Sequence, residues 1–291
     1  DRLNAAVRKV MAEPDVKKKY DDTLQTPGAG RGMLRELLNL LDGKVEIVER
    51  PPGVDPITST WAHKEQAAWK LEGNSPSVPE LRSRLCPRGF QQKPGESYNP
   101  DSTEAPTPRY ETIMLFHAIT VNRKQKVILI DEKSAFAETP LDPGDEVYME
   151  FPDGMHDPTG LHCLRLRNSI NGIKQAANNY YRRSKAFLLS KGFKVSKKDP
   201  CYFYKWNGDK FFQALVWVDD ARYAADEDEH LDQYVQEFQA THRCTTADGS
   251  EYLGTEITYD REGGTLTISV KKKVLSLLRQ YSMEDCRPVS T

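Results

Sequence analysis

The sequence predicts an α+β protein in which helices back a β-sheet. Runs of β-branched and aromatic residues typical of buried strands alternate with amphipathic helical segments, and no regular strand–helix–strand rhythm joins them. The 291 residues suffice for one large domain or two small ones. The 41 basic and 43 acidic side chains nearly balance. No apolar run approaches the roughly 20 residues of a membrane-spanning helix, so we expect a polar globular protein.

The N-terminal part combines helical and irregular segments. Apolar spacing predicts helices over residues 3–24 and 33–41, and Gly43 is expected to end the second. The glycine-rich residues 26–32 between them favour a flexible linker over a phosphate loop, because no strand precedes them and no Gly-Lys-Ser/Thr follows. Residues 50–109 are rich in Pro, Gly and Ser and predict a loop-rich region.

The rest of the chain shows clearer periodicity. Amphipathic spacing predicts four helices, over 112–121, 178–190, around 231–238 and over 271–281. Apolar β-branched and aromatic runs predict strands, over 125–130, 211–218 and 221–225, and a hairpin of 252–259 with 265–270 around 261–264. Together these segments supply the predicted sheet and its helical layer.

Three aspartates follow or join predicted strands. Asp131 ends the strand over 125–130, and Asp219 with Asp220 joins the two strands over 211–225. Carboxylates brought to neighbouring strand ends repel one another unless cations intervene, and their oxygens suit Mg²⁺. Two such ions about 4 Å apart can catalyse phosphoryl transfer. Asp is also a common turn residue, so residue types alone leave an ordinary turn as the alternative.

Cysteine and histidine usage does not indicate a metal centre. The five cysteines are scattered with no close pair, which argues against a disulfide framework and a structural zinc site. His156, His162 and Cys163 lie close in sequence, but ordinary loop residues are the favoured interpretation. The chain begins without the apolar core of a secretory signal and without Met. We therefore expect an excerpt of a longer polypeptide in a reducing intracellular compartment.

Basic residues gather in two segments despite the net charge of −2. Residues 182–198 contain seven Lys or Arg before any acid, and residues 271–279 add four more, whereas residues 226–229 are all acidic. Such clusters suit a phosphate backbone, and solvated helix faces are the alternative. If they bind nucleic acid, binding should weaken steeply with salt.

Several segments occur in an order that resembles a known family. Residues 131–136 are similar to a "DVKTAF" motif, and Trp217 to Asp220 stand where the family has "YVDD". Further matches are residues 82–92, 147–154, 164–176, 253–257 and 283–291. From about residue 45 onward the sequence resembles the reverse transcriptase domain of copia-type long-terminal-repeat retrotransposons.

The resemblance implies a right-hand polymerase of palm and fingers, with a mainly antiparallel palm sheet backed by helices and a truncated or absent thumb. It implies the following division: an N-terminal helical extension 1–44, fingers 45–110, palm 111–137, fingers 138–176, palm with a primer-grip hairpin 177–270, and the start of a thumb or connection 271–291.

The resemblance also implies roles for individual residues. Asp131, Asp219 and Asp220 would be the catalytic, metal-binding triad. Arg84 would bind the triphosphate, and Phe136 would be the steric gate under the sugar. The other nucleotide-binding residues would be Asn171, Gly172 and Lys174. Primer and template would contact Trp217, Leu253, Gly254, Arg182, Arg183, Lys271 and Lys272. Arg84 could equally be a solvated surface residue. Phe136 could equally be an ordinary core residue.

The implied function is RNA-directed DNA polymerisation, the transfer of a deoxynucleotide to a primer 3′-hydroxyl with two Mg²⁺ ions, or Mn²⁺. The implied partners are an RNA or DNA template with its primer and deoxynucleoside triphosphates, without a membrane. The implied location is the cytoplasm, within virus-like particles, with the nucleus as an alternative.

Departures from the family pattern keep a second function open. Trp217 and Asn171 each replace a Tyr, Ala177 replaces a Pro, and residues 137–140 differ from the family wording. The alternative is a degenerate or domesticated retroelement fragment that binds nucleic acid or protein without polymerising. A palm-type nucleotidyl cyclase fits less well, because it leaves the motif at 172–176 unexplained.

Overall fold

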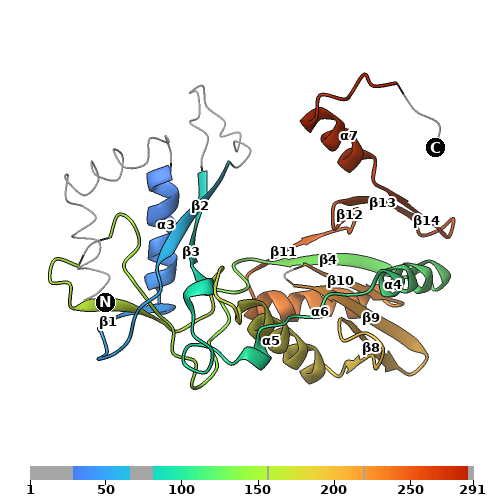
Figure 1. Cartoon of the computed structure of the whole chain (residues 1–291). Coiled ribbons are helices and arrows are strands. Elements are labelled where there is room, and N and C mark those ends of the chain that lie inside the picture. The colour runs from blue at the N-terminus through green and yellow to red at the C-terminus, as the bar shows by residue number, and fades with distance from the viewer. Residues whose placement is uncertain (1–28, 66–80, 156, 219, 288–291) are drawn as a thin grey trace, which may run out of the picture. The chain divides into compact units, whose positions relative to one another are not determined.

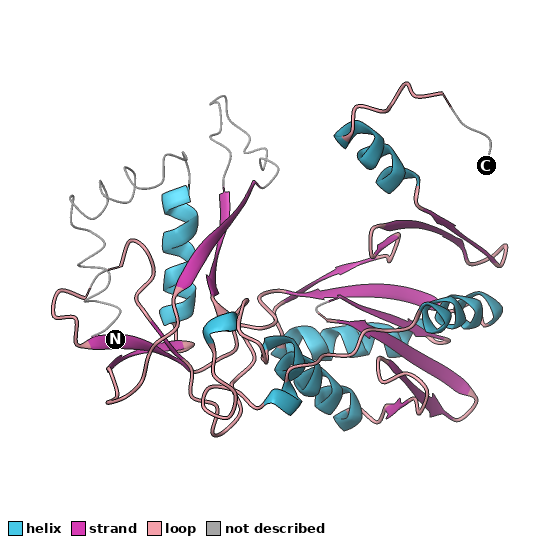
Figure 2. Cartoon of the chain, viewed as in Figure 1, coloured by secondary structure: helices cyan, strands magenta, loops and turns pink. Residues whose placement is uncertain are grey.

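The computed structural model describes residues 29–65, 81–155, 157–218 and 220–287, which combine helices with antiparallel sheets (Figure 2). The α+β prediction is thereby confirmed. The chain divides into two compact units, residues 1–105 with 134–183 (unit 1) and residues 106–133 with 184–291 (unit 2). The assignment of these units to fingers and palm stays a prediction. Among the described residues, no helix has the length and apolar character needed to cross a membrane.

Unit 1 packs a helix and two small sheets around one core. Met33, Leu37 and Leu40 lie on one stripe of the helix, and together with Leu85 and Met149 they are almost fully buried. The elements are helix α3 (Ala29–Leu41), the sheet β1 (Val45–Glu49), β6 (His162–Leu166) and β5 (Tyr148–Met149), the pair β2 (Ser59–Glu65) and β3 (Leu81–Pro87), and the short 3-10 helices η1 (Gly89–Gln91) and η2 (Pro100–Ser102).

Two expectations for this unit are wrong. The supposed loop region contains β2 and β3, which pair from Ser59 opposite Pro87 to Glu65 opposite Leu81. The linker expected over 26–32 is helical from Ala29 onward, because α3 packs against β3, and tertiary packing outweighs the low helix propensity of glycine. The helix expected over 3–24 lies outside the described residues.

Unit 2 is built on a six-stranded sheet in the order β11-β4-β10-β9-β8-β7. Its strands are β4 (Lys126–Glu132), β7 (Lys194–Val195), β8 (Tyr202–Asn207), β9 (Lys210–Trp217), β10 (Asp220–Ala225) and β11 (Cys244–Ala247). The helices are α4 (Tyr110–Asn122), residues 184–190 of α5 (Ala176–Ser190), α6 (Asp228–Thr241) and α7 (Lys271–Gln280). A smaller sheet comprises β12 (Glu251–Tyr252), β13 (Thr255–Asp260) and β14 (Thr265–Ser269). The predicted helices and the hairpin around 261–264 are confirmed.

The two faces of the large sheet have different cores, because alternate residues of a strand point to opposite faces. Ile130, Ala221 and Val216 pack with Leu231 and Phe238 of α6. The neighbouring positions Leu129, Leu215 and Ala224 pack instead with Phe116 of α4 and with Tyr252 and Ile257 of the small sheet. In Figure 1 the helices α5 and α6 accordingly lie on one side of the sheet and β12 to β14 on the other.

Candidate active site

A row of polar and aromatic residues crosses one end of the large sheet. Asp131 of β4 lies directly opposite Asp220 of β10. On the far side of β10, Asp220 lies opposite Trp217, and on the far side of β4, Asp131 lies opposite Thr245. Directly opposed residues share a face, with Cβ atoms about 5 Å apart. The register therefore brings two carboxylates from distant parts of the sequence together.

The apolar alternation of the strands fixes the face on which these carboxylates lie. Ile130 and Ala221, their immediate neighbours, belong to the core under α6. Asp131 and Asp220 therefore point to the opposite face, that of Leu129 and Phe116. A shift of the register by one residue would bury both carboxylates against α6 and expose the core residues, so the hydrophobic pattern itself specifies their placement.

The carboxylate of Asp131 is solvent-accessible and lightly held. It is exposed, and its Oδ2 accepts a long hydrogen bond of 3.4 Å from Oγ1 of Thr245. Asp220 is half-buried, and its charge helps to raise the pKa of the buried Tyr252 hydroxyl, for which burial is the main cause. Burial likewise raises the pKa of the Cys244 thiol, and Glu132 and Asp131 add to the shift. Negative charge is therefore concentrated at this end of the sheet.

The chemistry of these donors fits a divalent cation. Two opposed carboxylates supply the hard oxygen ligands that Mg²⁺ prefers. Asp219 lies outside the described residues, between Val218, whose φ is +47°, and the first residue of β10. Within the described ranges, no cluster of three or more His, Cys, Asp or Glu side chains could hold a metal. Asp131 and Asp220 are thus two members of the predicted three-carboxylate set, and its third member has no described position.

One predicted nucleotide-binding segment, around Gly172 and Lys174, contacts the end of the 82–92 motif within unit 1. Gly172 has a φ of +113°, and a Cβ there would collide with the carbonyl oxygen of Pro87. The backbone N–H of Lys174 donates to Oε1 of Gln92 over 2.8 Å, and Nε2 of Gln92 donates to Oε1 of Gln175 over 3.0 Å. These contacts join residues 87–92 to residues 172–175. The Lys174 ammonium donates to the Tyr98 hydroxyl over 3.0 Å.

The other nucleotide-binding candidates of unit 1 lie on different elements. Arg84 is exposed on β3 and helps to oppose the rise that burial causes in the pKa of Glu36. Phe136 is half-buried against the core of the unit, with its ring 6.0 Å from that of Tyr180. Asn171 is also half-buried. Their predicted contacts with a nucleotide stay predictions.

The predicted primer-grip residues form a tight turn. Leu253 and Gly254, with φ of +50° and +75°, join β12 to β13 between Tyr252 and Thr255, which are paired. Positive φ at both central residues is typical of a type I′ hairpin turn. Trp217 is half-buried against the same core as Leu253.

Several predicted backbone-binding cations have partners within the protein. Arg182 pairs with Asp142, and Nη1 of Arg183 donates to Oγ1 of Thr139 over 3.4 Å, both within unit 1. In unit 2, Lys272 lies 2.5 Å from Glu251 and 3.3 Å from Glu256, whereas Lys271 is exposed at the start of α7. Nucleic acid would therefore compete with carboxylates for Arg182 and Lys272.

The sequence interpretation missed two residues near the carboxylates. Thr245 belongs to the short polar strand β11, which has no apolar alternation to indicate it. Arg222 is only 2% exposed in the middle of β10. The sequence does indicate it, because an Arg two positions after Asp220, inside an otherwise apolar strand, is unusual.

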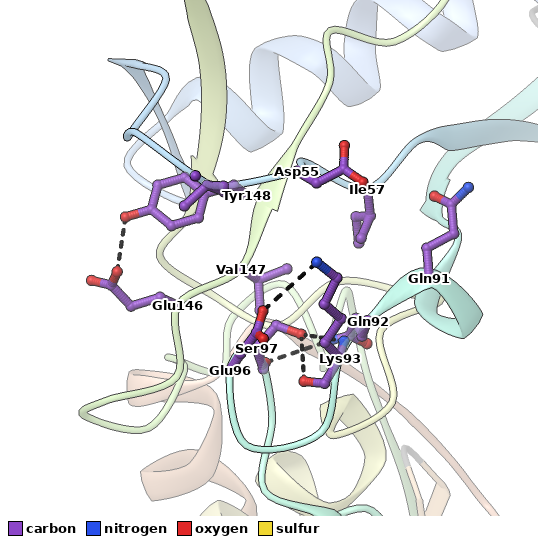
Figure 3. Close-up of a pocket in the computed structure, with 12 residues that line it drawn as sticks. Asp55, Ile57, Gln91, Gln92, Lys93, Glu96, Ser97, Glu146, Val147 and Tyr148 are labelled. Carbon is purple, nitrogen blue, oxygen red and sulfur yellow. Dashed lines mark hydrogen bonds and ion pairs between the residues drawn. The ribbon is translucent and has the colours of Figure 1, made fainter.

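Unit 1 also contains a pocket of about 220 Å³ that none of the predicted site residues lines (Figure 3). Its wall includes Asp55, Lys93, Glu96, Glu146 and Tyr148. Glu146 accepts a hydrogen bond from the Tyr148 hydroxyl over 2.9 Å, and Lys93 lies 3.9 Å from Glu96. The pocket is therefore a separate, mostly acidic hollow.

Comparison with known proteins agrees with the motifs. A family model described as reverse transcriptase (RNA-dependent DNA polymerase) matches residues 43–291. The Pol polyprotein of transposon TNT 1-94 from Nicotiana tabacum is 25% identical over 295 residues, covering 100% of this chain and 21% of that protein. Those of transposons RE2 and RE1 from Arabidopsis thaliana are 29% and 28% identical, covering 83% and 74% of this chain and 16% and 14% of those proteins. The chain therefore belongs to the reverse transcriptase (RNA-dependent DNA polymerase) family, and the predicted likeness to the reverse transcriptase domain of a copia-type retrotransposon polyprotein is confirmed.

Proposed function

We propose that this chain is the polymerase core of a retrotransposon enzyme, which adds deoxynucleotides to a primer 3′-hydroxyl on an RNA template. The observation that carries the proposal is the register that sets Asp131 opposite Asp220. These two carboxylates are 89 positions apart in sequence and meet at a water-accessible end of the sheet. Their mutual repulsion lowers stability unless a cation is bound between them. The family membership supplies the reaction class.

The roles of the chain's own residues follow from this arrangement. Asp131 and Asp220, with Asp219, would hold the metal ions and orient them towards the primer end and the triphosphate. Mg²⁺, when bound, supplies the Lewis acidity that activates a hydroxyl and stabilises a leaving pyrophosphate. Trp217, directly opposite Asp220, would present its ring beside the primer end. In unit 1, Arg84 and Lys174 would contribute positive charge towards the nucleotide, and Phe136 would select against a ribose 2′-hydroxyl.

The partners proposed are a template with its primer and deoxynucleoside triphosphates. The chain spans about a fifth or less of the length of the curated relatives it matches, so the activity of the whole polyprotein enters only as a proposal. Backbone contacts by Lys271 and Lys272 would release counterions. We therefore expect template–primer affinity to fall steeply between low and physiological salt, and binding indifferent to salt would contradict these contacts.

Primer extension on an RNA template with Mg²⁺ tests the function directly. Asp131→Asn and Asp220→Asn should each lower the extension rate about a thousandfold or more, because each removes a charged ligand from the cation site. Asp209→Asn is the matched control: Asp209 is exposed in the turn between β8 and β9, at the other end of β9 from Trp217. We expect this variant to extend at the wild-type rate.

Metal binding gives a second measurement that does not depend on turnover. Titration with Mn²⁺, followed by paramagnetic broadening of backbone amide signals, should broaden residues around 131 and 220 in the wild type. Asp220→Asn should lose that broadening, and Asp209→Asn should retain it. If a folded wild-type protein shows no Mn²⁺ broadening and extends no primer, the result favours the alternative function, a retroelement fragment that binds without polymerising.

A further inference from the structure

The most unusual buried group of unit 2 is the guanidinium of Arg222. This side chain is 2% exposed, and it lies on β10 two residues after Asp220, hence on the same face of the sheet. Its Cζ lies 5.1 Å from the ring centre of Tyr252 and 5.9 Å from that of Phe116. The guanidinium thus contacts aromatic rings from β12 and from α4.

Arg222 is not explained by pairing with a carboxylate. Its Nε and Nη1 atoms are buried and have no hydrogen-bond partner among the described residues. The charge of Asp248 favours the charged guanidinium, but it does not outweigh the cost of burial. Burial lowers its pKa to about 10, so the group stays charged at neutral pH. An apolar side chain of similar volume would fill this space without the desolvation cost. Packing alone therefore does not account for an Arg here.

The loop before β12 closes directly over the same group. Gly249 has a φ of +75°, and a Cβ added there would lie 3.0 Å from Nη2 of Arg222. The N–H of Ile257 donates to the carbonyl oxygen of Ser250 over 2.7 Å, which fastens this loop to β13. Tyr252, whose ring contacts the guanidinium, is the residue immediately before the Leu253–Gly254 turn.

We infer that Arg222 is a positioning residue that holds the β12–β13 turn against the strand carrying Asp220, through its contacts with Tyr252 and with the loop at Gly249. Through that turn it fixes where a primer end lies relative to the carboxylates. This second step rests on the proposed function. The cation–π contacts are favourable when desolvated, and they require a cation at this position.

Amide hydrogen exchange tests the anchoring without any need for catalysis. Arg222→Met keeps most of the volume and removes the charge, and it should speed exchange of the Ile257 amide about tenfold or more. The amides that pair β9 with β10 should exchange as in the wild type. Arg222→Lys keeps a cation against the rings and should restore most of the protection. Unchanged exchange at Ile257 in Arg222→Met would overturn the inference.

Tyr252 provides the matched pair of variants. Its hydroxyl has no hydrogen-bond partner among the described residues, so Tyr252→Phe should leave the exchange of Ile257 unchanged. Tyr252→Leu removes the ring and should also speed this exchange, and the effect of the double variant should fall short of the sum of the two single effects, because both substitutions remove the Arg222–Tyr252 contact. Additive effects of the two substitutions would show that Arg222 acts elsewhere and would overturn the inference.

Steady-state kinetics tests the positioning step. In Arg222→Met, kcat for primer extension should fall about tenfold while KM for the incoming nucleotide changes less than about twofold, because only the primer end is misplaced. A faster-exchanging turn with unchanged kcat would overturn primer positioning and leave the anchoring intact. If the wild type does not extend primers, the proposed function fails, and the exchange experiment still decides the anchoring.

Discussion

The two ends of strand β10 carry aspartates in contrasting environments. Asp226 comes directly after the last residue of β10. Its carboxylate accepts hydrogen bonds from Nε and Nη2 of Arg123, over 3.0 and 2.5 Å. It also accepts from Nε2 of Gln125 and from the backbone N–H of Phe211, each over 2.8 Å. Burial pushes its pKa upward, but these donors outweigh burial and hold the pKa below its ordinary value. At the other end of β10, Asp220 lies opposite Asp131 of β4. Asp131 is exposed and receives a 3.4 Å contact from Thr245.

This difference separates a carboxylate that holds the fold together from the exposed carboxylate of Asp131, which we propose as a cation ligand. The oxygens of Asp226 are fully used by the protein, and they tie α4, β9 and β10 together. Asp131 faces another carboxylate across the ladder, and like charges directly opposite destabilise a sheet. A placement that lowers stability in this way is expected at functional sites.

The largest expected effect is on folding stability. Asp226→Asn should lower the free energy of unfolding by about 3 kcal/mol, because it leaves Arg123 without its charged partner in a partly buried site. Asp131→Asn should leave that free energy unchanged within about 0.5 kcal/mol, or raise it, because it removes a repulsion. Urea unfolding monitored by circular dichroism measures both. If the two variants lose equal free energy of unfolding, the proposed difference between Asp226 and Asp131 is wrong.

A buried histidine makes the folding stability of unit 2 depend on pH. His117 of α4 is 5% exposed, and its Nδ1 has no hydrogen-bond partner among the described residues. Burial, aided by the charge of Arg222, lowers its pKa from 6.5 to about 4. Between these values the unfolded chain binds more protons than the folded one, so stability is complete above about pH 6.5 and falls as the pH drops towards 4.

The corresponding measurement compares unfolding at pH 7 and pH 5. The wild type should lose about 2 kcal/mol from this group on acidification. His117→Leu should lack this contribution, so its stability should change less over the same interval. Asp226, whose pKa is lowered in the folded protein, contributes its own loss only below about pH 4, where the unfolded chain binds the proton more readily than the folded one. An equal pH dependence in wild type and variant would show that His117 does not titrate in this range.

Apolar alternation made most of unit 2 predictable. Strands β4, β9 and β10 are nearly continuous apolar runs, so their existence and their polar ends were visible in sequence, and with them the positions of Asp131 and Asp220. Strand β2 and the helix start at Ala29 were not predictable, because β2 is largely polar and exposed, and because α3 depends on packing against β3.

The site itself was only partly predictable for a related reason. The order of the segments indicated which carboxylates belong together, but the ladder that pairs Asp131 with Thr245 depends on β11, whose side chains are mostly exposed. Arg222 escaped notice because a charged residue is expected at the surface. Its environment is set by Phe116 and Tyr252, which are 106 and 30 positions away in sequence and meet it only in the folded unit.

The smallest expected effect concerns Thr245. Its hydrogen bond to Asp131 is long and exposed, and such bonds contribute little. Thr245→Val should therefore change the free energy of unfolding by less than about 0.5 kcal/mol and the extension rate by no more than about threefold. Thr245→Ser, which retains the hydroxyl and loses the methyl group, controls for packing. A loss of extension in Thr245→Val as large as that in Asp131→Asn, with Thr245→Ser unaffected, would mean that the hydroxyl orients the carboxylate. Asp131 would then be held by the protein as Asp226 is, and the contrast between the two ends of the sheet would not explain the site.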